Sequence, residues 1–378
     1  MNADSHRLAD VILGKVRAHG PMTFDRFMDL ALNHPTLGYY SSPSPPIGPE
    51  GDYYTSSDVS PLFGAAVGRQ LHEMWLLLGK PRPFHILELG AGKGLTAADV
   101  LGWAGAAHPD WYSCIEYLIH ETGSGLRAIQ GARLHAHHVR WVELDDLPIG
   151  GLTGCILSNE VADALPFHRV RWADGELHEL WTTERDGALD EVLGGPSTAE
   201  LASYLQRHSV HLEEGWTAEI GLRAGPWMAR QVEALARGFV LTLDYGDRAD
   251  KLYSAHRPDG TLRCYHRHKI NREPFKRVGQ QDVTAHVNFS ELIDAARTAD
   301  AEVAGYTTQA YFLASLGIGE ALLNAGRRSP GQNEFARERA AVEELIQPDG
   351  LGSFRVLVCS KNVGSASLRG LALHNEHL

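Results

Sequence analysis

Two short stretches of this sequence carry residue types suited to binding a small ligand and transferring a group from it. The first, "ILELGAGKGL", places Gly90, Gly92 and Gly94 directly after an apolar strand pattern and before a helix pattern. Glycines at such a junction let the backbone turn tightly and approach a ligand, with the amino end of the helix beneath it. We expect a nucleotide-like ligand here, with a purely structural turn as the alternative.

The spacing favours S-adenosylmethionine over a dinucleotide. A dinucleotide fingerprint needs a third glycine three positions after Gly92, where this chain has Leu95. Glu88 lies two residues before Gly90. A carboxylate there would repel a pyrophosphate but attract the ammonium of an amino acid, and S-adenosylmethionine carries such an ammonium at its methionine end.

Further acids offer partners for the rest of that ligand. Glu121 ends the next strand pattern, in "LIHETG", where an acid can accept hydrogen bonds from both ribose hydroxyls. The alternative is a solvated acid at the end of a strand. In "RWVELDDLP", Asp145 and Asp146 are candidates for the adenine amino group, although acids in such a turn are commonly just solvated.

The second stretch, "CILSNEVADALPFH", places Glu160 and Asp163 after another apolar strand pattern. Its carboxyl end is expected near the point where the strand order of the sheet reverses and ligands bind. Methyl transfer from a sulfonium requires the acceptor to be held about 3 to 3.5 Å from the methyl group. Two carboxylates suit a guanidinium, which stays charged and presents a planar fork of donors. The alternative is that Asp163 merely caps a following helix.

The elements expected to position these residues form a doubly wound α/β core. Apolar strand patterns occupy residues 84–89, 115–121, 154–160, 239–246 and 354–360, and helical stretches separate them. Continuous apolar strands alternating with helices indicate a parallel sheet covered on both faces. The sequence therefore predicts this fold, with the sites at the carboxyl ends of the strands.

The remaining segments are expected to surround that core. Residues 1–33 predict two helices broken at Gly20-Pro21, with Thr23 as the N-cap of the second. Residues 34–64 form a long irregular segment rich in Gly, Pro, Ser and Tyr, which is typical of a functional loop. Its four aromatic residues favour an ordered lid, although they can equally anchor a loop on a core: Tyr39, Tyr40, Tyr53 and Tyr54.

The expected domain organisation has three parts. Residues 1–80 hold the N-terminal helices and the loop, and residues 81–170, 236–250 and 350–362 form the ligand-binding core. Residues 171–235 and 251–349 are expected to be insertions that form a substrate-facing layer. The alternating pattern of residues 169–193, with turn signals at Asp174-Gly175 and Asp186-Gly187, predicts antiparallel hairpins at the start of the first insertion.

Composition excludes several classes of function. The chain of 378 residues has a formal charge of −12, which argues against a nucleic-acid partner and suits a cationic ligand. Its four cysteines are scattered, and its histidines lack metal-ligand spacing, so neither a disulfide framework nor a metal site is expected. The sequence shows no secretory signal and no apolar run long enough to span a membrane, so we expect a cytoplasmic protein.

In combination, several stretches resemble the MidA family of S-adenosylmethionine-dependent methyltransferases. They are "HPTLGYY", "GDYYTSSDVSPLFG", "LELGAGKGL", "SNEVADALPFHRV", "LTLDYG", "GTLRCYHRH" and "QDVTAHVNFSEL". The likeness extends to "FLASLGI" and "FRVLVCSK" near the C-terminus. Mitochondrial members of that family are associated with symmetric dimethylation of protein arginine during assembly of respiratory complex I. This chain departs from the family pattern at Ala91, where proline is common, and at "TSSD", residues 55–58, where "TSPE" is usual.

The resemblance implies a class I methyltransferase fold and assigns roles to particular residues. It implies cofactor roles for Glu88, Gly90, Gly92, Gly94 and Glu121. It also implies that Asn159, Glu160 and Asp163 line the transfer site, bordered by Thr55, Ser56 and His286. Of these, we expect Glu160, Asp163 and His286 to be catalytic and Thr55, Ser56 and Asn159 to contact the cofactor.

We therefore expect an S-adenosylmethionine-dependent methyltransferase that acts on the guanidinium of an arginine in a protein. A small-molecule N- or O-methyltransferase is one alternative, and it would show a closed cavity under residues 34–60 in place of an open groove. A cofactor-binding assembly or scaffold protein with little catalysis is the other. Homodimerisation is left open.

Overall fold

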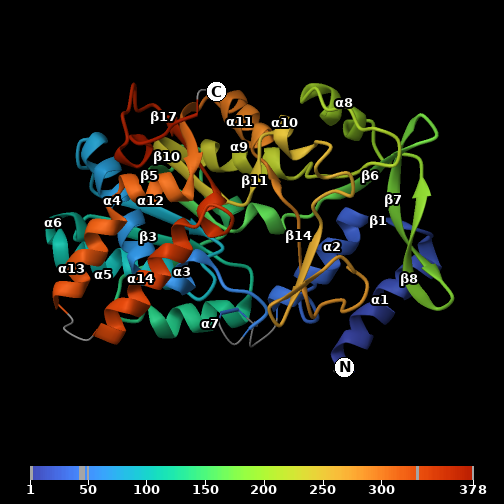
Figure 1. Cartoon of the computed structure of the whole chain (residues 1–378), viewed down its shortest axis with the longest axis horizontal. Coiled ribbons are helices and arrows are strands. Elements are labelled where there is room, and N and C mark those ends of the chain that lie inside the picture. Colours follow the sequence, from blue (N-terminus) through green and yellow to red (C-terminus); the bar gives the residue numbers. More distant parts are fainter. Residues whose placement is uncertain (1–2, 42–46, 49–50, 329–331, 377–378) are drawn as a thin grey trace.

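The structure is a computed structural model that describes residues 3–41, 47–48, 51–328 and 332–376. Its central feature is a seven-stranded sheet in the order β16-β17-β10-β5-β2-β3-β4 (Figure 1). The strands are β2 (Phe84–Leu89), β3 (Ile115–His120), β4 (Val139–Trp141), β5 (Leu152–Asn159), β10 (Leu235–Asp244), β16 (Glu302–Thr308) and β17 (Arg355–Lys361). The first five are parallel, and β17 pairs antiparallel with both β10 and β16.

The strand order reverses beside β2, which is the first strand of this sheet along the chain. The next two, β3 and β4, lie on one side of it, and β5 and β10 lie on the other. The crevice expected to bind ligands therefore lies at the carboxyl ends of β2 and β5. All five strands predicted from the sequence are present, which confirms the predicted α/β class with a parallel core.

Helices cover both faces of the sheet because its strands are apolar on both sides. Neighbouring residues of a strand point to opposite faces, and Ile86 and Leu87 accordingly belong to different buried clusters. On one face lie α4 (Pro61–Leu77), α5 (Leu95–Ala107), α6 (Pro109–Tyr112), α12 (Gln309–Ser315), α13 (Ile318–Arg328) and α14 (Gln332–Ile346). On the other lie α9 (Ala224–Ala234) and α11 (Phe289–Thr298).

A second body of structure adjoins the end of the sheet where the ligand crevice lies (Figure 1). It begins with α1 (Ala3–His19), β1 (Met22–Thr23) and α2 (Phe24–Asn33), and Thr23 caps α2 as predicted. β1 joins a sheet with β6 (His168–Ala173), β7 (Glu176–Arg185), β8 (Ala188–Gly194) and β9 (Thr217–Ile220), which α8 (Glu200–Arg207) covers. Both predicted hairpin turns are confirmed, and all four turn residues have positive φ.

Smaller elements connect these two bodies. A three-stranded sheet consists of β12 (Arg263–His266), β13 (Lys269–Asn271) and β14 (Asp282–Thr284). A short pair consists of β11 (Gly246–Asp247) and β15 (Val287–Asn288), next to α10 (Ala249–Leu252). Two further short helices are α3 (Ser56–Val59), just before α4, and α7 (Ser124–Arg133), just after β3. Of the predicted irregular segment 34–64, residues 42–46 and 49–50 lie outside the described residues.

Parts of both expected insertions pack against the central sheet or belong to it. Residues 302–308, expected in the second insertion, form β16 at the edge of the central sheet. Helix α9 of the first expected insertion and α11 of the second bury apolar side chains directly against that sheet. The physical reason is that the apolar strands need cover on both faces, and these segments supply it. Within the described part of the chain, no helix is long and apolar enough to span a membrane.

Candidate active site

The glycine segment turns sharply where β2 ends. Gly90 and Gly92 have φ of 60° and 53°, in the left-handed region that favours glycine. A Cβ on Gly90 would lie 2.8 Å from a methyl group of Val161, so this glycine allows close packing. A Cβ on Gly92 would meet no described atom within 4 Å, so this glycine faces open space. Gly94, with φ of 73°, is the N-cap residue directly before helix α5.

A cavity of about 610 Å³, here called the glycine-loop cavity, opens beside that turn. Gly90, Gly92, Glu121 and Glu160 are among its lining residues. Its volume lies within the range of about 300 to 1,000 Å³ that is typical of small-molecule sites.

Glu121 is fixed in the wall of this cavity by hydrogen bonds from both sides. The backbone N–H of Gly123 donates to Oε1 at 2.9 Å, and the amide of Gln130 donates to Oε2 at 3.1 Å. The same amide also donates to the carbonyl of Gly92 at 2.8 Å, so Gln130 links Glu121 to the glycine turn. Burial raises the pKa of Glu121.

Glu88 lies in a narrower extension of about 50 Å³, together with Thr55, Asn159 and Glu160. The hydroxyl of Tyr117 donates a hydrogen bond of 2.7 Å to Glu88. Burial raises the pKa of Glu88 to about 7. A cationic ligand group beside this carboxyl would favour its ionised form.

The acids that follow β5 sit on a turn held by a third acid from the neighbouring strand. Asp244 ends β10, and its Oδ2 accepts hydrogen bonds from three successive backbone N–H groups. The donors are Val161 at 3.1 Å, Ala162 at 2.9 Å and Asp163 at 3.3 Å. Glu160 has φ of 54°, a conformation that a non-glycine residue keeps only when its surroundings hold it. Asp244 therefore fixes the turn that presents both predicted acids.

In both Glu160 and Asp163, one carboxylate oxygen accepts hydrogen bonds from protein donors. Oε1 of Glu160 accepts from the backbone N–H of Ser56 at 3.0 Å and from the amide of Asn159 at 3.1 Å. Oδ2 of Asp163 accepts from the hydroxyl of Tyr245, whereas its buried Oδ1 has no partner among the described residues. Burial raises the pKa of Glu160 to about 8 and that of Asp163 to about 6.

A second cavity, here called the acidic cavity, opens on the other side of Glu160 and measures about 710 Å³. Asp163, Asp282 and His286 line it, whereas Glu160, Tyr40 and Tyr53 line both this cavity and the glycine-loop cavity. The two cavities therefore meet at Glu160, which is the geometry required of a site that brings two ligands together.

Asp282 adds a third buried carboxyl to the acidic cavity. The hydroxyl of Tyr40 donates to it at 2.8 Å. Burial, and next the charge of Asp163, raise the pKa of Asp282 to about 7. Buried carboxyls that lack cationic partners resist ionisation, and a bound cation would reverse that effect. The acidic cavity is thus suited to a positively charged ligand.

The other predicted site residues lie around these cavities in different ways. Thr55 lines the extension near Glu88, and Ser56 contributes through its backbone N–H to Glu160. His286 lines the acidic cavity, with its ring centroid 5.5 Å from that of Tyr245. Burial lowers the pKa of His286 to about 4, so the imidazole is neutral at pH 7. Gly94 is not among the described residues that line either cavity.

Two secondary interpretations of acidic residues can also be compared with the structure. Asp145, with a side chain 97% exposed, and Asp146 lie on the surface, because the short turn that carries them directs Leu144 into the cavity instead. Asp163 does not cap a following helix, because it lies inside the turn Ala162–Ala164 and the next element is β6.

Comparison with known proteins supplies the family. Residues 66–307 match the profile of a family of S-adenosyl-L-methionine-dependent methyltransferases. That match covers well over half of the chain. The chain belongs to this methyltransferase family. The resemblance stated from the sequence motifs, the enzyme class and the cofactor are therefore confirmed.

Related proteins match this methyltransferase over most of its length. The Drosophila melanogaster protein named protein arginine methyltransferase NDUFAF7 homolog, mitochondrial, is 28% identical over 96% of this chain and 86% of its own. The Homo sapiens protein named protein arginine methyltransferase NDUFAF7, mitochondrial, is 27% identical over 81% of this chain and 72% of its own. A crystal structure of a protein from Burkholderia thailandensis, described as a likely methyl transferase and bound to S-adenosyl-homocysteine, has a TM-score of 0.90 and 30% identity. It covers 99% of this chain and 96% of its own.

Proposed function

We propose that this methyltransferase transfers a methyl group to a guanidinium nitrogen of an arginine in a protein. The observation that carries the proposal is the position of Glu160 between the two cavities, with Asp163 and Asp282 beside it. One cavity suits the cofactor, and the other presents buried carboxyls to a cation. The names of the Drosophila and human relatives, which are protein arginine methyltransferases, support the same acceptor.

In this proposal the glycine-loop cavity holds S-adenosylmethionine. Gly92 leaves open space beside the turn, Glu121 offers acceptors for the ribose hydroxyls, and Glu88 faces the amino group of the methionine end. Thr55 and Asn159 line the same end of the cavity. The residues present fit the cofactor. When bound, it supplies a methyl group on a sulfonium, and the thioether leaves when a nucleophile takes that methyl group.

Glu160 and Asp163 hold the acceptor. Ser56 and Asn159 occupy Oε1 of Glu160, so its second oxygen remains for the guanidinium. Tyr245 orients Asp163, whose unpartnered Oδ1 can accept a second N–H of the same fork. Such a two-point grip positions the reacting nitrogen and offsets its charge.

The mouth of the acidic cavity supports a protein acceptor over a small molecule. Tyr54, 40% exposed, and Ile270, 57% exposed, lie at its rim. A closed cavity is expected for an enzyme that sequesters a small acceptor. An open, partly apolar rim instead leaves room for the polypeptide on either side of an arginine whose side chain enters the cavity. The compartment and the oligomeric state stay predictions for this chain, and the relatives named above are called mitochondrial.

The test is a labelling experiment in a lysate of the host lacking this gene. The protein is incubated with S-adenosylmethionine labelled in its methyl group, and the labelled species are identified by mass spectrometry. We expect label on arginine within a protein, and no such label when the Gly92→Val variant replaces the wild type. Label confined to small molecules, or to another amino acid, would reject the proposed acceptor.

A further inference from the structure

The methionine end of S-adenosylmethionine carries a carboxylate beside its ammonium, and Glu88 can serve only the ammonium. Within the described residues, the lining of the glycine-loop cavity includes acids but no lysine or arginine. A carboxylate that is buried among acids needs a cation or hydrogen-bond donors to offset the cost of leaving water. A cation is therefore expected close to Glu88, which faces the cofactor's ammonium in the proposed function.

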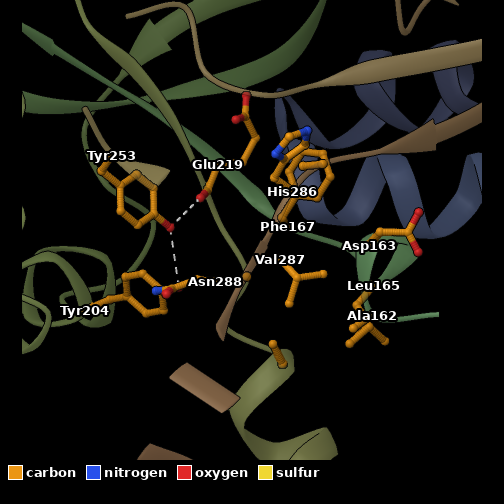
Figure 2. Close-up of a pocket in the computed structure, with 13 residues that line it drawn as sticks. Ala162, Asp163, Leu165, Phe167, Tyr204, Glu219, Tyr253, His286, Val287 and Asn288 are labelled. Atoms are coloured by element: carbon orange, nitrogen blue, oxygen red, sulfur yellow. Dashed lines mark hydrogen bonds between the residues drawn. The ribbon is translucent and has the colours of Figure 1, made fainter. Parts of the chain in front are cut away.

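Two other cavities offer no cation on the cofactor side. Figure 2 shows Asp163, Glu219 and His286 at a small cavity of about 30 Å³, whose described lining includes no lysine or arginine. Its imidazole is neutral at pH 7, because burial lowers the pKa of His286 to about 4. Asp163 and His286 also line the acidic cavity, so the small cavity adjoins the acceptor side. Arg263 lines the acidic cavity, but it lines neither the glycine-loop cavity nor the extension that holds Glu88.

Lys93 supplies a cation on the cofactor side. It belongs to the glycine turn itself, and it lines the narrow extension of about 50 Å³ together with Glu88 and Asp58. No other lysine or arginine is among the described residues that line this extension. A carboxyl and a cation in one narrow space match the two opposite charges of an amino acid group.

The side-chain ammonium of Lys93 is fixed in place and keeps donors for a ligand. The side chain is 20% exposed and forms an ion pair with Oδ1 of Asp58, whose side chain is 3% exposed. A lysine ammonium has three N–H donors, and Asp58 is its one acceptor among the described residues. Two donors therefore remain. The backbone carbonyl of Lys93 accepts a hydrogen bond from Nε of Arg133 at 2.9 Å, which anchors the main chain of the turn.

Asp58 is itself held, because it caps the short helix α3. Its Oδ2 accepts hydrogen bonds from the backbone N–H of Thr55 at 3.1 Å and from the hydroxyl of Thr55 at 3.2 Å. The first residue of that helix, Ser56, donates its N–H to Glu160 at 3.0 Å. The helix that fixes the partner of Lys93 therefore also contacts the acid that joins the two large cavities.

We propose that Lys93 binds the carboxylate at the methionine end of the cofactor, and that Asp58 holds the side chain of Lys93 in position for this contact. The inference rests on the proposed function only for the placing of the methionine end beside Glu88. Glu88 then pairs with the cofactor's ammonium and Lys93 with its carboxylate, so the protein recognises the whole amino acid group. A ligand that lacks the carboxylate loses the contact with Lys93.

The test compares S-adenosylmethionine with its decarboxylated form, which keeps both the ammonium and the sulfonium. In calorimetric titrations we expect the wild type to bind S-adenosylmethionine about tenfold or more tightly than the decarboxylated form, the scale of one hydrogen bond between charged groups. Lys93→Met removes the cation, so its two dissociation constants should lie within about threefold of each other. Its affinity for the decarboxylated form should stay within about threefold of the wild-type value, which also shows that the variant is folded.

Two further variants are controls for the charge of Lys93. Lys93→Arg keeps a cation at the same position and should still prefer S-adenosylmethionine by about threefold or more. Lys251→Met removes a lysine whose Nζ lies 3.8 Å from Glu376. Lys251 is not among the described residues that line the glycine-loop cavity or its extension, so this variant should bind both ligands like the wild type.

A crystal structure with S-adenosyl-homocysteine, which has the same amino acid group, provides a check that needs no variant. A carboxylate oxygen should lie within hydrogen-bonding distance of Nζ of Lys93. A carboxylate held only by other groups would overturn the proposal.

Three outcomes of the titrations would also overturn it. Equal affinity of the wild type for the two ligands would show that the carboxylate is not recognised. An equal loss of affinity for both ligands in Lys93→Met would give Lys93 a purely structural role, and an unchanged preference in that variant would exclude it as the partner. The titrations need no acceptor. A labelled acceptor other than arginine would therefore reject the proposed function and leave the result for Lys93 unchanged.

Discussion

At the scale of single residues, the buried carboxyls make the stability of the ligand-free protein depend on pH. Glu160 has a pKa of about 8 in the folded protein, raised from 4.5 mainly by burial. A folded-state pKa above the unfolded value contributes stability that is complete below pH 4.5 and is lost as pH rises through 8. We expect the Glu160→Gln variant, without ligands, to melt higher than the wild type by a margin that grows between pH 5 and pH 8 and then levels off. Thermal melts across that range test this, and a margin independent of pH would contradict it.

Glu121 provides a second residue-scale prediction. Replacing it with alanine removes acceptors from the wall of the glycine-loop cavity. We expect the affinity for S-adenosylmethionine to fall by about 1.5 to 3 kcal/mol, the scale of a hydrogen bond to a charged group. Glu116→Ala is a matched control, because Glu116 lies on β3, the strand that Glu121 directly follows, and pairs with Arg140 outside the cavity. Calorimetric titration measures the affinity of both variants and of the wild type for S-adenosylmethionine. A Glu121→Ala variant that binds as tightly as the wild type would show that Glu121 is not part of the site.

At the scale of elements, Asp244 is expected to control the turn that follows β5. Its two oxygens accept from three N–H groups of the turn and from the N–H of Tyr245. An asparagine would have to direct its NH₂ group at one of these sets of donors. We expect Asp244→Asn to lose about 1 to 3 kcal/mol of unfolding free energy, and methyl transfer in the folded fraction to fall. Wild-type values for both the denaturant midpoint and the transfer rate would contradict this role.

The glycine turn gives a prediction that compares one variant in the turn with a control variant in the helix that follows it. Gly92→Val places a side chain in the open space of the cavity, so S-adenosylmethionine binding should be abolished while the far-ultraviolet circular dichroism stays native. Gly102→Val is the control, because Gly102 is an exposed residue of α5 where an added Cβ would meet no described atom within 4 Å. If both variants bind the cofactor like the wild type, the cavity beside Gly92 is not its site.

The sequence predicts those elements whose signal is local. The five apolar strands and the two Asp-Gly turns are patterns within a few residues, and each is present where expected. Strand β16 gives no such signal, because only its pairing with β17, about 50 residues later, makes it part of the sheet. Asp244 was missed for the same reason, since its partners lie some 80 residues earlier. An acid that ends a buried strand, like Glu121, is the signal that would have pointed to it.

At the scale of the whole molecule, the site is assembled from parts of the chain that are distant in sequence. Tyr40 and Tyr53 come from the N-terminal region, Glu160 from the end of β5, and Asp282 and His286 from the segment around β14. Glu160 and Asp163 could be predicted because their type and spacing follow a strand. The acidic cavity itself could not, because it exists only where the sheet of β12, β13 and β14, residues 52–54 and residues 344–354 meet the segment that follows β5.

The central claim is that Glu160 and Asp163 hold a guanidinium for methyl transfer. The most direct measurement is single-turnover transfer of labelled methyl groups by the wild type, Glu160→Gln and Asp163→Asn, with cofactor affinity and melting temperature measured on the same samples. We expect transfer to arginine to fall by about 10² or more in both variants, with cofactor affinity within a few-fold of wild type for at least one of them. Wild-type transfer rates in both variants would contradict the account and favour a neutral acceptor.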